Sequence, residues 1–494
     1  MAKKVAVIGS GFGGLGIALR LQCQGYNVEI FEKQDKLGGH AGQIKEKGYT
    51  FDMGPSLITA PQIIENLFST ADRKIEDYLD LHYLDPFYRV YFHDKTFIDY
   101  NGKPEEMQKQ IAKFNKKDAD SYLKFLEFSK EIYKAVIVDG LGAESFHKLG
   151  TMLKFAPKFI KTKSIFPGYF QASQFFKDWR TRFLFSFHPL FIGGNPFRVP
   201  SIYLMISYLE KEGGVWYSTG GMYSFVTALN KIFEEYGGKS FVNSEVEEII
   251  VDNKKISGLR VNGETRNYDI VVSNADITHT NSKLLKNAKI KSWGDNKLSK
   301  AKYSMSCFVL YIGVKKRYPE LLHHTLILSP RYKELVKDIF DNHVLPDDFS
   351  MYLHVPSKTD RSMAPDGCES IYVLAPVTNL QNPIDWSVKG KVFADMMMDY
   401  LENEFGMDGL TDNLDYVSWF TPDDFKNQRN SHLGSPWGLE PILTQTAYFR
   451  PHNTSPDIEN LYYVGAGTHP GAGVPGVLLS AEATEKLVVK DNPL

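Results

Sequence analysis

Three glycines near the start of the chain have the spacing of a loop that holds phosphate groups. Gly9, Gly11 and Gly14 form the pattern G-x-G-x-x-G. The first permits a tight turn, the second lets backbone N–H groups approach a pyrophosphate, and the third lets a helix pack closely on a strand. Glu32, 23 positions after Gly9, is placed to accept hydrogen bonds from ribose hydroxyls. These four residues predict a dinucleotide site; the alternative is an accidental glycine-rich turn.

The residues before and after this loop predict the strands and the helix that must position it. Residues 4–9 are a short apolar run of β-branched residues ending in glycine, as in a buried parallel strand. Residues 14–25 have apolar side chains at helical spacing and end at a glycine. Residues 27–32 form a second strand that ends at the acid. The order strand, glycine turn, helix and strand predicts a βαβ unit.

Two further glycine-containing segments follow the acid. They consist of Gly38, Gly39, His40, Gly54, Pro55 and Ser56. The first is typical of flavoproteins whose loop returns to the diphosphate, and the second predicts a rigid turn that faces a flavin, with an ordinary β-turn as the alternative. Val246, in a predicted strand, is a candidate for a backbone contact to adenine, although a strand role alone explains it equally.

A glycine-rich segment near the other end of the chain predicts the second half of the same site. Its candidate cofactor residues are Gly465, Gly467, Gly473 and Val474. The segment leads into a predicted helix over 477–488, whose N-terminus would stabilise negative charge on a reduced isoalloxazine. A chain with two widely separated glycine-rich turns is expected to enclose one long cofactor from both ends. The predicted cofactor is therefore FAD.

Composition excludes several other classes of protein. The 494 residues carry 57 lysines and arginines against 59 acids, so the net charge of −2 gives no electrostatic case for nucleic acid binding. The three cysteines are far apart, so we predict neither a disulfide framework nor a metal site. The first residues lack the apolar region of a secretory signal, and we expect a cytoplasmic protein. An aromatic content of 13% fits a long apolar cavity or an aromatic core equally well.

The order of predicted elements is interleaved, so we expect an α/β protein with discontinuous domains. A Rossmann-like FAD-binding domain is predicted to comprise residues 1–66, 213–290 and 455–494. A substrate-binding domain with a mixed sheet is predicted to comprise 67–103 and 291–454. Residues 104–212 have mainly helical patterns and are predicted to form an inserted helical, membrane-facing subdomain.

Seven motifs spread over essentially the whole chain give it a specific resemblance. They are YTFDMGPSLIT from Tyr49, SFHPLFIGGNPF from Ser186, GGVWYSTGGM from Gly213, VVSNAD from Val271, SMYLHVPSKTDRSMAPDGCESIYVLAPV from Ser350, LEPILTQTAYFRPHN from Leu439 and NLYYVGAGTHPGAGVPGVLLSAEAT from Asn460. With these motifs the chain resembles the bacterial and fungal phytoene desaturases, within the flavin amine-oxidase-like proteins. The resemblance implies an FAD-dependent, membrane-associated oxidoreductase acting on a C40 or C30 acyclic polyene.

The chain departs from that family at two places. His40 stands where many relatives have arginine, which puts a fixed cationic contact to the diphosphate in doubt. Ser218 and Thr219 stand where relatives often have proline and a basic residue, so a cofactor or substrate contact there is expected to differ.

A basic and aromatic segment is the candidate membrane contact. Residues 148–177 contain six lysines and no acid, with apolar residues interleaved. This pattern is typical of a surface that lies on an anionic bilayer, from which a lipid-dissolved substrate could enter. The alternative is a solvated basic helix with one buried face.

Desaturation of a polyene removes a hydride to a flavin and a proton to a modest acceptor, so the protein has mainly to orient its substrate. Candidate proton acceptors are His469 and His188, and with less support His354 and Asp52, although a structural role is the more frequent one for such residues. Oxygen or a membrane quinone is the expected electron acceptor.

The expected activity is desaturation of phytoene to lycopene by a protein peripheral to the cytoplasmic membrane. The alternatives are a C30 diapophytoene desaturase, a hydroxycarotenoid 3,4-desaturase, a flavin-dependent carotenoid isomerase and a carotenoid-binding protein. The sequence leaves the number of steps and the oligomeric state open.

Overall fold

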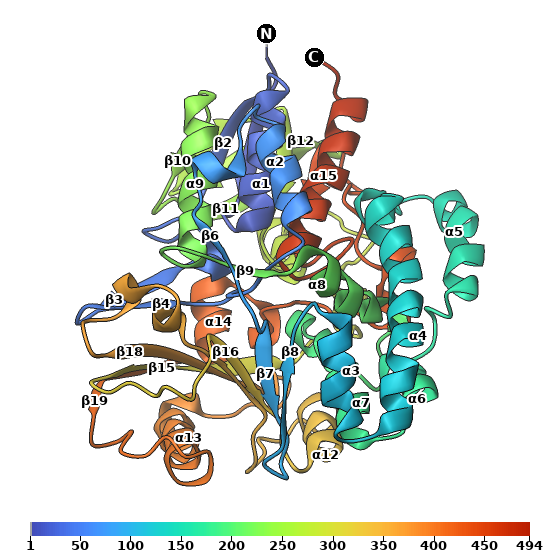
Figure 1. Cartoon of the computed structure of the whole chain (residues 1–494). Helices are drawn as coiled ribbons and strands as arrows, with labels where there is room; N and C mark the ends of the chain where they lie inside the picture. The colour runs from blue at the N-terminus through green and yellow to red at the C-terminus, as the bar shows by residue number, and fades with distance from the viewer. Residues whose placement is uncertain (1) are drawn as a thin grey trace.

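A parallel sheet carries the N-terminal glycine loop in the computed structural model, which describes residues 2–494 (Figure 1). Its five strands lie in the order β10 (Lys239–Phe241), β2 (Asn27–Phe31), β1 (Lys4–Ile8), β14 (Ile270–Ser273) and β20 (Leu461–Tyr463). These strands come from the beginning, the middle and the end of the chain. Late segments therefore complete the sheet that the first residues begin, and the exact residues at which domains divide stay a prediction.

The predicted βαβ unit is present, and its helix begins earlier than predicted. Helix α1 (Phe12–Cys23) connects β1 to β2 and packs against α9 (Met222–Glu235) and α15 (Val474–Asp491). It was expected from Gly14, but Gly11 has extended backbone and forms its N-cap, so Gly13 and Gly14 lie in its first turn. The strands bury apolar residues on both faces, as expected for a parallel sheet covered by helices.

A larger mixed sheet forms the second body of strands, on the lower left of Figure 1. Its seven strands lie in the order β19 (Leu414–Phe420), β15 (Ser306–Val314), β18 (Glu369–Val377), β17 (Met351–His354), β16 (His324–Ile327), β7 (Tyr88–Tyr91) and β8 (Phe97–Tyr100). Only β16 and β7 pair in parallel; the other neighbours are antiparallel. Together with the parallel sheet and its helices, this sheet confirms the predicted mixed α/β class.

Three small sheets contain the remaining strands. They are β11 (Val246–Asp252) with β12 (Lys255–Val261) and β13 (Glu264–Asn267), β3 (Gln43–Glu46) with β4 (Tyr49–Asp52), and β5 (Ile58–Thr59) with β9 (Val215–Ser218) and β6 (Leu81–Tyr83). Apart from α1, α9, α15 and the block of helices described next, the α-helices are α2 (Pro61–Ser69), α10 (Ile277–His279), α11 (Asp295–Leu298), α12 (Tyr332–Lys337), α13 (Trp386–Asp399) and α14 (Pro422–Arg429).

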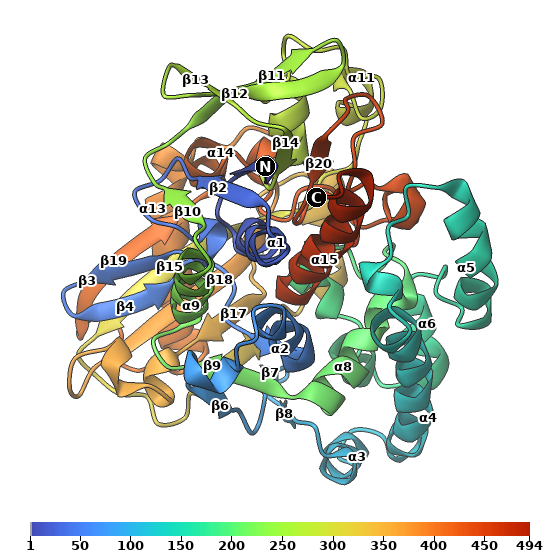
Figure 2. The same ribbon diagram turned by 90° about the horizontal axis from the view of Figure 1, so that it is seen from above.

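A block of helices lies to one side of both sheets. It contains α3 (Pro104–Ala112), α4 (Lys116–Tyr133), α5 (Leu149–Lys161), α6 (Gly168–Phe175), α7 (Trp179–Leu184) and α8 (Ile206–Gly213). Both views place α5 at the outer edge of this block (Figures 1 and 2). Helix α5 buries none of its residues, although it is strongly amphipathic. Among residues 2–494, no helix combines the length and the apolar character needed to cross a membrane.

Candidate functional site

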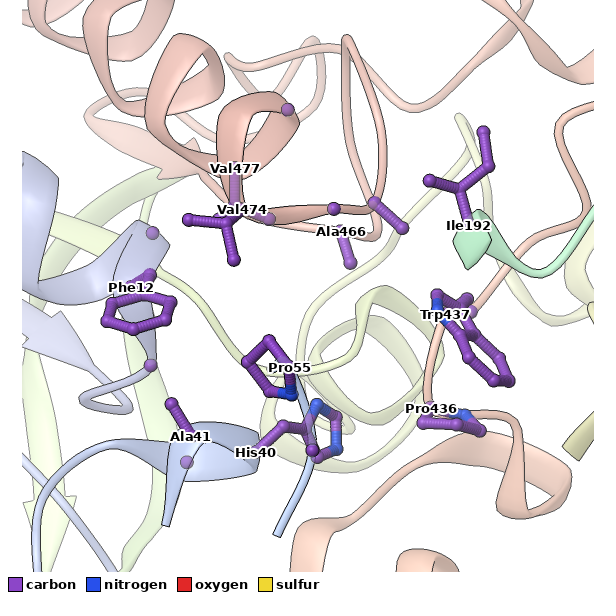
Figure 3. A pocket seen from close by; sticks show the side chains of 18 of the residues that line it. Phe12, His40, Ala41, Pro55, Ile192, Pro436, Trp437, Ala466, Val474 and Val477 are labelled. Atoms are coloured by element: carbon purple, nitrogen blue, oxygen red, sulfur yellow. The ribbon is translucent and has the colours of Figure 1, made fainter. Parts of the chain in front are cut away.

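One cavity of about 550 Å³ extends between the parallel sheet, the large mixed sheet and the helical block. Figure 3 shows Phe12 and Ala41 on one side of the open space, Val474 above it, and Trp437 and Pro436 on the opposite side. The lining therefore joins residues from the N-terminal loop, the C-terminal segment and the substrate side. The two glycine-rich turns predicted to enclose one ligand do face the same space.

The first glycine loop has a left-handed residue and two glycines that leave no room for a side chain. Gly9 has φ of +88°, a conformation that favours glycine. A Cβ on Gly14 would lie 2.0 Å from the carbonyl oxygen of Gly9, and one on Gly13 would lie 2.5 Å from Asn274 Oδ1. Because the loop leads directly into α1, the free N–H groups of that helix face the cavity and can bind an anion.

Glu32 joins the first loop to the second glycine pair. It lies just after β2 and lines the cavity. Its carboxylate accepts hydrogen bonds from Ser10 N at 3.1 Å and Ser10 Oγ at 2.7 Å, and from Gln34 N at 3.0 Å. Ser10 Oγ in turn accepts a hydrogen bond from Gly38 N at 3.0 Å. This chain of contacts presents a buried carboxylate at the end of the strand, where a ribose would lie.

The other residues predicted to bind the cofactor divide into those that line the cavity and those that support it. The lining includes Gly9, Gly11, Gly38, Gly39, His40, Gly54, Pro55, Ser56, Val246, Gly467, Gly473 and Val474. Gly14 and Gly465 stand behind the lining. A Cβ on Gly465, at φ of +96°, would lie 2.5 Å from Asn274 Oδ1. Ser218 and Thr219 are not in the lining; Thr219 Oγ1 donates to Asp80 at 2.7 Å instead.

The cation at the His40 end of the cavity is Arg429, which sequence reasoning missed. Burial, and then the nearby Arg429 guanidinium, lower the pKa of His40 to about 4, so His40 is neutral at pH 7. Arg429 lines the cavity and pairs with no carboxylate among the described residues. It lies in the last turn of α14, nearly 400 positions after the glycine pair, and no spacing in the sequence connects the two.

A second buried arginine, Arg450, holds the C-terminal glycine segment in place. Its guanidinium donates to the carbonyl oxygens of Thr468 at 2.9 Å, Ala466 at 2.6 Å and Gln445 at 3.2 Å. The side chain is 1% exposed and also lines the cavity. The resemblance motif LEPILTQTAYFRPHN contains Arg450, but the motif gave no reason to single this residue out.

The two histidines predicted as proton acceptors lie outside the lining. His469 packs with its ring 4.9 Å from that of Phe146, and burial lowers its pKa to about 3. His188 is completely buried, with Nε2 3.0 Å from Tyr88 Oη and 3.3 Å from Glu210 Oε2. Glu210 does line the cavity and accepts a hydrogen bond from Tyr88 at 2.9 Å. His188 is thus connected to the cavity through Glu210, and its role stays a prediction.

The far part of the cavity is mainly apolar and aromatic. Its walls include Phe187, Leu190, Phe191, Met305, Leu326, Leu328, Met351, Tyr352, Tyr372, Leu374 and Trp437. Val136, Ile137 and Gly142 also line it, in the segment that precedes α5. Such a wall recognises a ligand by apolar area and shape.

These features fit FAD. The loop with its closely packed Gly13 and Gly14, the helix N-terminus behind it and the carboxylate at the end of β2 match the pyrophosphate and ribose of a dinucleotide. The unpaired Arg429 adds a cation for the diphosphate. The second helix N-terminus, at Val474, adds a dipole above the space (Figure 3).

Comparisons with known proteins agree with this assignment. Residues 12–484 match the family described as flavin containing amine oxidoreductase. A phytoene desaturase (lycopene-forming) from Pseudescherichia vulneris is 43% identical over 491 residues, 99% of each chain. A phytoene desaturase (neurosporene-forming) from Cereibacter sphaeroides is 40% identical and covers 98% of this chain and 94% of its own length.

Solved structures show the same fold at much lower identity. A cyclohexylamine oxidase from Brevibacterium oxydans superposes with a TM-score of 0.62 at 12% identity, covering 99% of both chains. The family predicted from the motifs is confirmed, and so is the flavin cofactor. The chain belongs to the phytoene desaturase family of bacteria, within the flavin containing amine oxidoreductases, and is an FAD-dependent oxidoreductase.

Proposed function

We propose that the protein desaturates an acyclic carotenoid precursor, converting phytoene to lycopene in successive steps. The observation that carries this proposal is a single cavity whose glycine-lined end fits FAD and whose other end is lined by apolar and aromatic side chains. A hydrocarbon has no polar group to bind, so such a wall is the recognition surface that it requires. The relatives that make lycopene, at high identity over the full length, support the choice of substrate.

When bound, FAD supplies the acceptor for the hydride that leaves the carbon chain. The residues of the chain have three other tasks. The first glycine loop, Glu32 and Arg429 would hold the cofactor, and the apolar wall orients the polyene and excludes water. A basic group near the wall must take the proton from the adjacent carbon.

The test is a product analysis with purified protein, FAD and phytoene-loaded liposomes. We expect the extract to develop the long-wavelength absorption of lycopene, with a mass loss of two hydrogen atoms per step. An unchanged mass with altered absorption would indicate an isomerase, and unchanged phytoene would contradict the proposal. Parallel liposomes with diapophytoene or a hydroxycarotenoid test the C30 and 3,4-desaturase alternatives. Anaerobic assays with and without a quinone distinguish the two proposed electron acceptors.

We place the proton acceptor at Glu210, with His188 behind it. Glu210 is the carboxylate that lines the cavity beside the apolar residues Leu209 and Phe187, and it is 1% exposed. Its contact with His188 Nε2, at 3.3 Å, gives the proton a second site to which it can move.

Replacing Glu210 by glutamine keeps the shape and removes the basic oxygen. We expect Glu210→Gln to lower the rate of phytoene conversion by roughly 100-fold or more while FAD content stays unchanged. Glu212→Gln, at an exposed neighbouring position, is the matched control. Measured initial rates equal to wild type would exclude Glu210 as the acceptor.

We also propose that α5 and the segment after it bind the surface of an anionic membrane. No residue of the helix is fully buried, and its Met152, Phe155 and Phe159 side chains are only half-buried, so the fold leaves much of its apolar surface uncovered. Leu153 and Ile160 are 63% and 65% exposed, and Phe166 and Phe170 in the following segment are also exposed. Because the cavity lining reaches Val136 and Ile137 shortly before α5, substrate dissolved in lipid could enter nearby.

Four lysines provide the test of membrane binding. Changing Lys154, Lys158, Lys161 and Lys163 to glutamine is expected to weaken binding to anionic vesicles at least about tenfold, because each lysine near such a surface contributes about 1 kcal/mol. Lys158 pairs with Asp139, so the other three contribute most. The control changes Lys109, Lys113, Lys116 and Lys117, which are exposed on and between α3 and α4. Equal cosedimentation of the two variants would contradict the proposal.

Arg429 offers a test of the cofactor end. A charged hydrogen bond to a phosphate contributes about 1.5–3 kcal/mol, so Arg429→Gln is expected to weaken FAD binding roughly tenfold to 100-fold. Arg429→Lys should retain part of the affinity because it keeps the charge. Titration of flavin-free protein with FAD, followed by flavin fluorescence, measures both. An affinity equal to wild type for the glutamine variant would place the diphosphate elsewhere.

A further inference from the structure

Three histidines and one aspartate converge behind the cavity wall, although they lie far apart in the sequence. His324 is the first residue of β16 and His354 the last of β17, and the two are direct partners in the register of these strands. His323 precedes β16, and Asp52 is the last residue of β4. All four are buried, and none of them lines the cavity.

The donor atoms of this cluster face one another without hydrogen-bond partners. Nε2 of His323, Nε2 of His324, both ring nitrogens of His354 and Oδ2 of Asp52 are buried and unbonded among the described residues. A ligand nitrogen from each of the three imidazoles lies within 4.8 Å of the other two. Asp52 stands beside this group, with Oδ2 3.5 Å from His354 Nε2, and would have to move inward to become a fourth ligand. Because buried polar atoms nearly always have a partner, a group of unbonded atoms at one point requires an explanation.

The outer nitrogens of two of these rings are held in place, as the ligands of a metal site usually are. His323 Nδ1 is 2.6 Å from Thr359 Oγ1, and His324 Nδ1 is 2.8 Å from Tyr352 Oη. Each hydroxyl can accept the proton of its Nδ1, which leaves the Nε2 lone pair directed at the common centre. Asp52 Oδ1 is likewise fixed, by Met222 N at 3.0 Å.

The spacing of the rings fits one tetrahedral ion. With a Zn–N bond of about 2.0–2.1 Å, an imidazole centroid lies about 3.2 Å from the metal, so tetrahedral neighbours have centroids about 5 Å apart. The three measured centroid distances are 4.5 Å for His323 and His324, 5.0 Å for His323 and His354, and 5.1 Å for His324 and His354. A small inward movement of the ring nitrogens would complete the coordination.

From this geometry we propose that His323, His324, His354 and Asp52 bind one divalent transition-metal ion, with Zn²⁺ as the ion that fits best. Three imidazoles and a carboxylate suit zinc, whereas Ca²⁺ and Mg²⁺ prefer sites built from oxygen ligands. A divalent ion would also compensate the buried Asp52 carboxylate, which is paired with no lysine or arginine among the described residues and accepts a hydrogen bond from Met222 N.

The ion would connect β4, which leads into the turn Met53–Gly54–Pro55 of the cavity wall, to the strands that carry Tyr352. Its role would be to fix the cofactor side of the cavity relative to the substrate side. With four protein ligands the site is closed, as structural zinc sites are, and the inference does not depend on the identity of the substrate.

The experiment uses the full chain without a histidine tag, loaded with FAD. After treatment with a chelator and desalting, the protein is incubated with Zn²⁺, desalted again and analysed for metal by mass spectrometry. We expect about one zinc per chain for wild type and for His93→Gln, an exposed control histidine, and less than about 0.2 for His354→Gln and Asp52→Asn. Zinc should also raise the melting temperature of wild type and of His93→Gln, but not that of His354→Gln or Asp52→Asn.

If the variants fail to fold, the visible absorption spectrum of wild type loaded with Co²⁺ tests the same site. Co²⁺ in place of Zn²⁺ is expected to give the visible bands of tetrahedral coordination. Wild-type protein that retains no Zn²⁺ and shows no such bands would overturn the proposal, as would full zinc retention by a folded His354→Gln variant.

Discussion

Replacing Gly14 by alanine is expected to yield protein that does not retain FAD. The new Cβ would lie 2.0 Å from the carbonyl oxygen of Gly9, a distance that no real contact tolerates, and that atom belongs to rigid backbone. The loop must therefore move away from the N-terminus of α1. Overpacking of this kind costs about 1–3 kcal/mol or more, and because the displaced N–H groups are those that hold the pyrophosphate, we expect FAD affinity to fall by roughly 100-fold.

The matched control is Gly16→Ala, on the same helix. A Cβ there would lie 3.3 Å from Ala481 Cβ and 3.4 Å from Leu478 Cδ2, contacts between side chains that small shifts can relieve. Gly16→Ala should keep most of its flavin. The ratio of flavin absorbance to protein in the purified variants measures the difference, and equal flavin content in both would show that the loop does not hold the cofactor.

Replacing Arg450 by methionine is expected to have the largest effect on stability. The guanidinium donates to carbonyl oxygens of Thr468, Ala466 and Gln445; the bonds to Thr468 and Gln445 are buried and the bond to Ala466 is partly buried. Each buried acceptor left unpaired costs about 1–3 kcal/mol, so the loss for three is about 3–9 kcal/mol. The C-terminal glycine segment that Arg450 holds also lines the cavity, so flavin content should fall together with stability.

Thermal unfolding with and without added FAD measures this effect. We expect a melting temperature lowered by several degrees for Arg450→Met, with partial recovery for Arg450→Lys, which keeps a single donor group. Arg331→Met removes an exposed arginine that pairs with Asp338 and Asp348 at the surface, and should leave the melting temperature unchanged. If Arg450→Met unfolds at the same temperature as wild type, the carbonyl contacts are not required for the fold.

Arg429 and Arg450 bear on whether a cation can contact the diphosphate when His40 stands in place of an arginine. A neutral imidazole at that position does not leave the cofactor end without positive charge, because Arg429 reaches the same place from α14. Arg450 acts in a different way, since its contacts are to backbone oxygens of the segment that it holds. Substitutions at His40 alone are therefore a poor test of how the diphosphate is held.

Local sequence patterns specify the part of the site that is built from neighbouring backbone. Gly9, Gly11 and Gly14 have roles that depend on residues a few positions away, and a strand, a turn and a helix are specified by local patterning. The family motifs, which are spread along the whole chain, could likewise be identified from the sequence. For these reasons the βαβ unit, the FAD cofactor and the family could be predicted and were confirmed.

Which side chains from distant parts of the chain meet in one place depends on how the chain folds. Periodicity shows that a residue is buried, but it does not name the partner against which it packs. The sequence therefore gave no reason to bring Arg429 to the glycine loop, to turn His469 toward Phe146, or to gather His323, His324 and His354 around Asp52. It also left open whether the basic segment 148–177 buries a face, because that depends on which element packs against α5. In the fold the short turn Ala447–Phe449 contacts α5 and leaves none of its residues fully buried.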